Sequence, residues 1–143
     1  MITNKRLKIW TIIFQAFIIV GFGHGIAIFA LIEIFWFPYF TKEQFSFAFD
    51  ASFESHLPVI GLTTLLGQVA LIFSILNKGQ HFKSTFQIAG FLLLWLSVIY
   101  FIHDAAKDTY MYFAAITCVP FAICTIITFV GQPIRKFFNW VLK

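Results

Sequence analysis

Charged residues are scarce in this sequence. Only 11% of the 143 residues are Asp, Glu, Lys or Arg, whereas a soluble domain carries roughly 25%. Hydrophobic residues make up 60% of the chain, and the mean hydropathy is +0.89. These values exclude an ordinary soluble domain. We expect a single integral membrane domain over residues 1–143, with the lipid bilayer as its first partner.

Cysteine is almost absent as well. The two cysteines, Cys118 and Cys124, lie six positions apart within one apolar stretch. On a helix they would be about 9 Å apart along the axis and would point roughly 120° apart, which excludes a mutual disulfide. We expect both to act as small packing residues.

A continuous basic face is also missing, although the formal net charge is +4. The basic residues lie just outside the apolar stretches, where they set membrane orientation and meet anionic headgroups. Nucleic-acid binding requires a basic stripe. We therefore expect no nucleic-acid partner.

Long apolar stretches are what the sequence does contain. Four of them predict membrane-spanning helices at about 9–37, 56–76, 85–103 and 110–130. The loops between them are short, which favours antiparallel neighbours. The expected fold is an all-α membrane protein, an up-down bundle of four antiparallel transmembrane helices.

The two charge signs fall in different segments between these stretches. All six acidic residues lie in the first and third connections or at their edges, whereas most basic residues lie at the termini and in the second connection, namely Lys5, Arg6, Lys8, Lys78, Lys83, Arg135, Lys136 and Lys143. Positive loops stay in the cytoplasm. Both termini are therefore predicted to be cytoplasmic, with the chain in a plasma (inner) membrane.

Two shorter amphipathic segments flank the spans. Thr41 and Gln44 have capping-box spacing, and Phe45, Phe49 and Phe53 recur at spacing four, which predicts a short helix over 42–54 on the outer surface. After residue 133, apolar residues at helical spacing alternate with basic ones. This pattern predicts an amphipathic C-terminal tail at the cytoplasmic interface.

Small residues mark the faces where helices are expected to meet. Gly21 and Gly25 form such a pair in the first stretch, and Ala114, Cys118 and Ala122 form a longer one in the fourth. In lipid, close backbone approach drives helix association. We expect these two faces to contact each other. Polar residues of the second stretch, Thr64 and Gln68, are expected to hydrogen-bond to another helix.

Two ionisable residues lie inside the first stretch. His24 is about 13 Å deeper than Glu33 by helical rise, and a charge at the membrane centre costs roughly 2.5–3.5 kcal/mol. For His24 the simplest interpretation is a neutral imidazole bonded to a neighbouring helix. For Glu33 it is a carboxylate that reaches water or pairs with Lys42 or Lys107.

Acids and histidines also gather at the predicted outer end. Glu33, Glu54, His56, His103 and Asp104 all fall there, and such side chains ligate zinc, copper or non-haem iron. A transition-metal site is therefore one hypothesis, and acidity dictated by topology alone is the other. The Glu-x-x-His motif of di-iron bundles is absent. Haem is not expected, because two histidines at similar depth are lacking.

Together these residues predict an outward-facing pocket with His24, Glu33 and Gln68 in its wall and Phe45 and Phe49 in its lid. An apolar or lipid-like ligand would suit it. If metal binds beside the pocket, it would activate water for catalysis, with a carboxylate as base; whether the chain is an enzyme stays open.

Two other functions fit the same pattern. One is a non-catalytic structural or accessory subunit, in a homo- or hetero-oligomer. The other is a small-solute or proton-coupled transporter, because intramembrane acids and histidines often carry protons.

Overall fold

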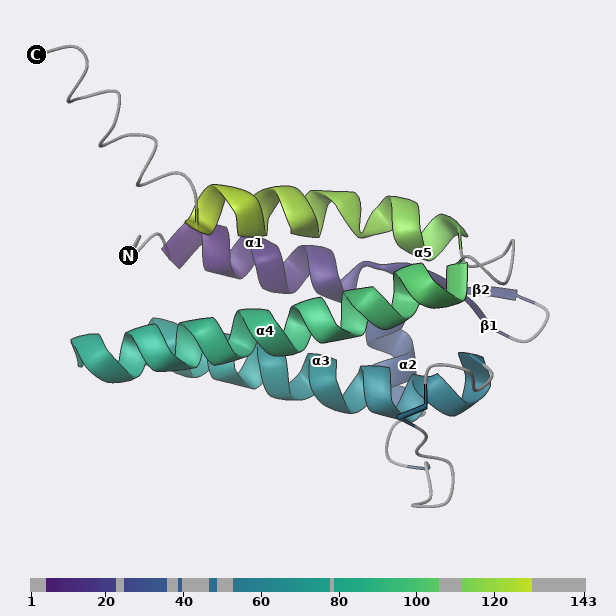
Figure 1. The fold of residues 1–143 in the computed structure, drawn as a ribbon, viewed down its shortest axis with the longest axis horizontal. Helices are drawn as coiled ribbons and strands as arrows, with labels where there is room; N and C mark the ends of the chain where they lie inside the picture. The colour runs from purple at the N-terminus through teal and green to yellow at the C-terminus, as the bar shows by residue number, and fades with distance from the viewer. Residues whose placement is uncertain are drawn as a thin grey trace, which may run out of the picture.

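A computed structural model describes residues 5–22, 25–35, 39, 47–48, 53–77, 79–105 and 112–129. This part of the chain is mostly helical (Figure 1). In chain order its elements are α1 Lys5–Ala16, β1 Ile19–Phe22, β2 Gly25–Ile28, α2 Phe29–Phe35, α3 Phe53–Leu76, α4 Gln80–Ala105 and α5 Tyr112–Thr117. After a turn at Cys118, residues 119–129 are helical again.

Three of the helical segments are long and apolar enough to cross a membrane. They cover Ser55–Leu76, His81–Asp104 and Tyr112–Phe129, with mean hydropathies of 2.2, 2.0 and 2.0. They coincide with the second, third and fourth predicted spans. This agrees with the expected class of integral membrane protein.

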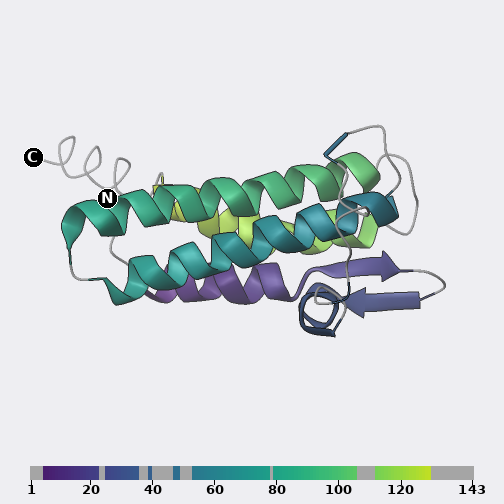
Figure 2. The ribbon, with the colours of Figure 1, turned by 90° about the horizontal axis from the view of Figure 1, so that it is seen from below.

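The first predicted span is wrong as a continuous helix. Between residues 9 and 37 the chain forms α1, an antiparallel hairpin of β1 and β2, and α2. The strands pair Ile19 with Ile28 and Phe22 with Gly25. Gly23 and His24, which separate the strands in the sequence, lie outside the described residues. Figure 2 shows α1 leading into the hairpin along the long direction of the molecule.

Local chemistry explains why this helix stops. Gly21 and Gly25 each cost about 1 kcal/mol in a helix interior, and the β-branched run from Ile18 to Val20 prefers extended backbone. The amide of Phe29 then donates to the carbonyl of Ile18 at 2.8 Å, which closes the hairpin below its last pair. An apolar run long enough for a span thus folds as two helices and a hairpin.

The longest helices, α3 and α4, pack closely and run in opposite directions. Ser74 near the end of α3 contacts Lys83 near the start of α4, and His56 near the start of α3 contacts Asp104 near the end of α4. At mid-length the backbones approach so closely that a Cβ built on Gly67 would lie 3.0 Å from the Gly90 carbonyl oxygen. Glycine therefore sets the separation of this helix pair.

Aromatic side chains fill the space between α4 and the elements that pack against it. Phe29 of α2 meets Phe101 of α4 edge-on with ring centroids 5.2 Å apart. Near the middle of α4, Phe91 contacts Phe129 with centroids 5.1 Å apart. Both Phe29 and Phe101 are fully buried. Large apolar residues such as Leu92 face outward, as lipid contact requires.

The segments that carry the small residues are in contact, but not as the two helices that the sequence predicted. α5 packs against β1, the strand that contains Gly21. The contact includes a hydrogen bond that the Ile19 amide donates to Thr117 Oγ1 at 3.0 Å. At this contact the partner of α5 is therefore a strand and not the helix that was predicted.

Several predicted boundaries also need correction. α3 begins at Phe53 and α4 at Gln80, a few residues before the predicted starts of the second and third spans at about 56 and 85. The predicted outer-surface helix over 42–54 is wrong at Phe47 and Ala48, which are not helical. Residues 41–46 and 49–52 and the predicted C-terminal tail lie outside the described residues.

Candidate functional site

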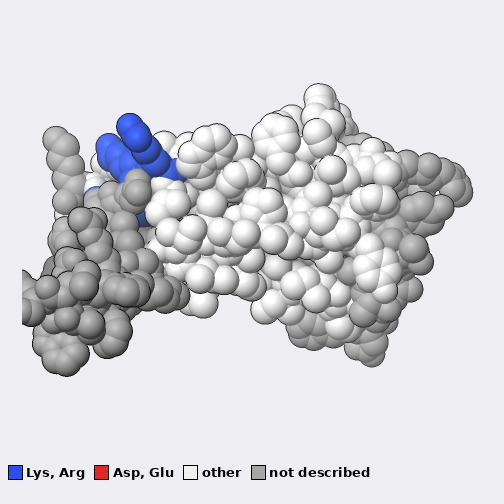
Figure 3. All heavy atoms as spheres, turned by 90° about the horizontal axis from the view of Figure 1, so that it is seen from above, with Lys and Arg blue, Asp and Glu red and all other residues white. Residues whose placement is uncertain are grey.

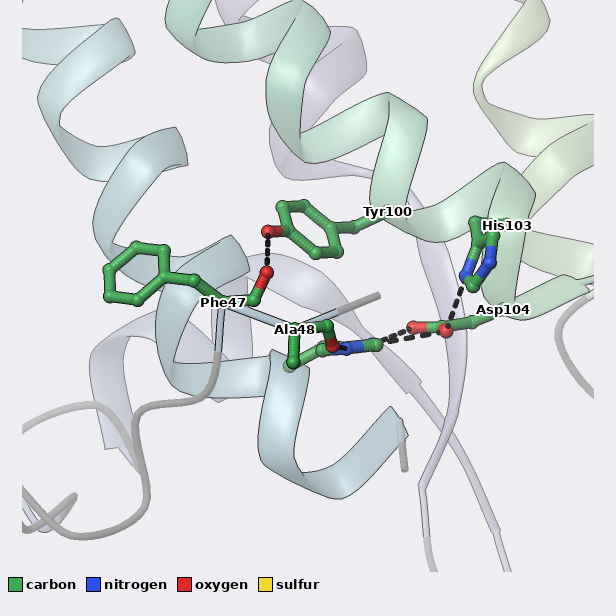
Figure 4. A network of polar contacts seen from close by, with 6 residues as sticks. Phe47, Ala48, Tyr100, His103 and Asp104 are labelled. Atoms are coloured by element: carbon green, nitrogen blue, oxygen red, sulfur yellow. Dashed lines mark hydrogen bonds and ion pairs between the residues drawn. The ribbon is translucent and has the colours of Figure 1, made fainter. Parts of the chain in front are cut away.

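The candidate site lies where α3 begins and α4 ends, which we call the His56 end of the molecule. His56 is fully buried, and its Nδ1 lies 2.9 Å from Asp104 Oδ2 and 3.1 Å from Oδ1. Asp104 is itself 2% exposed. The helix pair thus brings a histidine and a carboxylate, far apart in the sequence, into one buried contact (Figure 4).

Backbone of the long connection between α2 and α3 closes over this pair. The carbonyl oxygen of Ala48 lies 2.7 Å from His56 Nε2. The hydroxyl of Tyr100 donates to the carbonyl oxygen of Phe47 at 3.1 Å, and the Tyr100 ring lies against His56 with centroids 5.0 Å apart. Figure 4 shows both carbonyls turned toward these side chains. We call this arrangement the loop clamp.

Hydrogen-bond chemistry determines where the protons of the clamp lie. A carbonyl oxygen only accepts, so His56 Nε2 must carry a proton and donate it to Ala48. Nδ1 then either donates to ionised Asp104 or accepts from protonated Asp104. In both cases the pair holds the same number of protons and is neutral as a unit, which suits a buried position.

This geometry resembles part of a catalytic dyad but blocks its chemistry. A carboxylate that orients His Nδ1 leaves Nε2 to take a proton from a nucleophile or substrate. Here Nε2 is occupied by the Ala48 carbonyl. In the described conformation His56 is therefore a structural donor and not a general base.

The metal hypothesis finds no ligand group in the described part of the chain. His103 Nδ1 lies 3.5 Å from Asp104 Oδ1, so two histidines do meet Asp104. Even so, no group of three or more His, Cys, Asp or Glu among the described residues is placed to hold a metal ion. Glu33 contacts Gln68 instead, and the side chain of Glu54 lies outside the description.

Glu33 forms a second polar centre on the bundle interior. α2 positions its side chain against α3, where Gln68 Nε2 donates to Glu33 Oε2 at 3.4 Å. Glu33 is only 7% exposed. Its other oxygen, Oε1, is buried without a hydrogen-bond partner among the described residues, and the same holds for Thr64 Oγ1 on α3.

Thr64 and Gln68 lie one helical turn apart on α3 and therefore share a face. We call Glu33, Thr64 and Gln68 the Glu33 site. The sequence predicted that Thr64 and Gln68 hydrogen-bond to another helix. The donation from Gln68 to α2 confirms this for Gln68, whereas the prediction is wrong for Thr64, whose Oγ1 has no partner among the described residues. Lys42 and Lys107, the ion-pair partners suggested for Glu33, lie outside the described residues, as do the pocket residues His24, Phe45 and Phe49.

A third set of polar contacts ties α1 to the helix pair. Gln15 Nε2 donates to Ser97 Oγ at 2.8 Å. At the opposite end from His56, Lys8 Nζ donates to Ser74 Oγ at 2.6 Å, and Ser74 Oγ donates to the Lys83 carbonyl at 2.9 Å. Sequence reasoning missed both contacts. Their signal was the presence of isolated polar residues within apolar stretches, which in lipid need internal partners.

The chain was compared with protein families, with curated proteins and with solved structures, and no match was found in any of the three comparisons.

Proposed function

We propose that the chain is an integral membrane protein that binds an apolar, lipid-like ligand with a polar head at the Glu33 site. It would cross a plasma membrane four times with both termini cytoplasmic. The His56 end would then face outward, and the loop clamp would hold the first outer connection against the bundle.

The first crossing in this proposal is a helix followed by a strand. The eight residues of α1 from Ile9 to Ala16 rise about 12 Å, the four of β1 rise about 13 Å, and the connecting residues Phe17 and Ile18 add up to about 7 Å. The total of about 25–32 Å is close to the thickness of the hydrocarbon core, about 30 Å. Backbone in a strand is tolerated at this depth only where protein covers it, and α5 covers β1.

The observation that carries the ligand proposal is the unfilled hydrogen-bonding capacity of Glu33. A buried polar atom without a partner costs about 1–3 kcal/mol, yet Glu33 Oε1 and Thr64 Oγ1 are both in this state among the described residues. A hydroxyl or amine head would donate a hydrogen bond to Glu33 Oε1. The same head group would also accept a hydrogen bond from the Thr64 hydroxyl. Neighbouring α2 residues such as Ile34 are exposed and would meet the ligand's apolar tail in the bilayer.

A photoreactive long-chain alcohol tests this function in native membranes. We expect the diazirine-bearing 16-carbon alcohol to label the chain, and the matched hydrocarbon without a hydroxyl to label it weakly. Glu33→Leu should lower labelling about 10-fold or more, as the loss of a hydrogen bond to a charged group predicts. Glu33→Gln retains an acceptor and should lower it less.

Gln87→Leu is the matched control, because Gln87 is also buried and its Nε2 also lacks a partner in the described part. Its labelling should equal that of the parent chain. Equal labelling of the parent and Glu33→Leu would reject the ligand site. It would leave a non-catalytic accessory subunit, with its predicted oligomeric contacts, as the better interpretation.

A proton-coupled transporter is the second candidate, and the burial of Glu33 favours it. A carboxyl group inside a membrane bundle is a common proton carrier. Proton flux into liposomes that contain the purified chain should then fall on Glu33→Gln. Unchanged flux would remove Glu33 from this role.

A further inference from the structure

The end of the molecule opposite His56, where α1 and α4 begin and α3 ends, concentrates positive charge. Ser74 Oγ accepts a hydrogen bond from Lys8 Nζ there and donates one to the backbone carbonyl of Lys83, and the charge of Lys83 acts on the Lys8 amine. Lys5 and Arg6 are exposed on the first turn of α1. In Figure 3 the Lys and Arg side chains gather at this one end of the visible face. We call these four basic residues the Lys8 cluster.

Within the part of the chain that the structure describes, the amines of Lys5, Lys8 and Lys83 form no ion pair with an acidic side chain. The described acidic side chains there are Glu33 and Asp104, and both have other partners, Gln68 and His56.

The buried amine of Lys8 is affected by this imbalance. Lys8 precedes the predicted first span, and its side chain is 1% exposed. Burial, together with the nearby charge of Lys83, lowers the pKa of Lys8 from 10.5 to about 8. An anion beside the two amines would offset their repulsion, because opposite charges within about 4–6 Å favour the charged form.

We propose that the Lys8 cluster binds the phosphate group of an anionic phospholipid. Lys83 and the exposed Lys5 and Arg6 would contact the phosphate oxygens. The buried amine of Lys8 would attract the phosphate electrostatically without touching it. This assignment is independent of the Glu33 site, which lies on other residues of α2 and α3.

Apolar surface beside the cluster favours a lipid over free phosphate. Trp10 on α1 is 50% exposed, and Phe82 on α4 is 66% exposed. Trp10 lies one helical turn after Arg6 and shares its face, and Phe82 is adjacent to Lys83 in α4. Tryptophan is favoured at the headgroup level, so a lipid would place its phosphate on the basic residues and the start of its acyl chains beside Trp10.

Thermal unfolding of the detergent-purified chain tests the proposal with three additives: phosphatidylglycerol, phosphatidylcholine and inorganic phosphate. We expect phosphatidylglycerol to raise Tm by about 4 °C, and the other two to leave it unchanged. Lys83→Gln keeps the backbone carbonyl that Ser74 uses and should reduce the shift. Lys8→Met should also reduce it, and Lys107→Gln, which removes a cation elsewhere in the sequence, should not.

Two results would overturn the proposal. An equal phosphatidylglycerol shift in Lys83→Gln and the parent chain would mean that the Lys8 cluster does not hold the headgroup. A full shift with inorganic phosphate alone would assign the cluster to a soluble anion and reject the lipid. If Lys8→Met fails to fold, Lys83→Gln still decides between these outcomes.

Discussion

His56 and Asp104 are 48 positions apart in the sequence, and their side chains meet in a buried contact of 2.9 Å. The contact joins the start of α3 to the end of α4. Because Ala48 accepts a hydrogen bond from the same imidazole, this one pair also fixes the connection that precedes α3. The stability of the His56 end should therefore depend on the hydrogen bond at Nδ1.

Two substitutions at Asp104 separate hydrogen bonding from charge. Asp104→Asn can donate its amide proton to Nδ1 of a neutral imidazole, so we expect the free energy of unfolding to change by less than about 1 kcal/mol. Asp104→Leu leaves Nδ1 without a partner and should cost about 3 kcal/mol. Unfolding in mixed detergent micelles measures both. Equal losses for the two variants would mean that the charge, and not the hydrogen bond, holds the contact.

The glycine contact between α3 and α4 predicts that the stability of the fold depends strongly on the size of the side chain at position 67. Gly67→Ala would place a Cβ 2.8 Å from Leu94 and 3.0 Å from the backbone oxygen of Gly90. The helices must then separate, and we expect a loss of about 2 kcal/mol in unfolding free energy. Gly79→Ala is the control, because its Cβ would lie 3.7 Å from Phe82 in ordinary contact. Similar stabilities for the two variants would show that α3 and α4 are not so close.

The hairpin should depend on one side chain of α5. Thr117→Val keeps the shape of the side chain but removes the acceptor for the Ile19 amide, at a cost of about 1–2 kcal/mol. Thr128→Val removes only a bond to Cys124 of the same helix and should cost less. The rate of hydrogen exchange at the Ile19 amide directly measures whether this hydrogen bond is present. Unchanged protection of this amide in Thr117→Val would contradict the contact.

The buried amine of Lys8 predicts a rise in stability with pH. Its pKa is lowered from 10.5 to about 8 in the folded chain, so between these values the unfolded chain holds a proton that the folded chain has lost. Raising the pH through this window therefore stabilises the fold. Without anionic lipid, Tm of the parent should rise relative to Lys8→Met from about pH 8 to about pH 10. A constant difference would contradict the lowered pKa.

Sequence reasoning identified the long helices because length and hydropathy alone determine them. It failed in the first stretch because a mostly apolar run has no periodicity that distinguishes a strand from a helix. Gly21, Gly23 and Gly25 alternate with other residues, and this pattern indicates a hairpin. The length of the apolar run nevertheless favoured a spanning helix.

At the candidate site the sequence predicted proximity but not contacts. Charge sidedness placed His56, His103 and Asp104 at one end, and the structure brings these three together. The Ala48 carbonyl was beyond prediction, because any residue type can supply a backbone acceptor. For Glu33, partners were sought among lysines, whereas the structure pairs it with an amide on α3.

Mapping the position of the photoreactive alcohol after proteolysis and mass spectrometry tests the ligand site most directly. The account predicts label on α2 and α3 peptides that contain Glu33 or Gln68, and loss of that label in Glu33→Leu. Label spread evenly over the lipid-facing residues of all helices, with no change in Glu33→Leu, would contradict it.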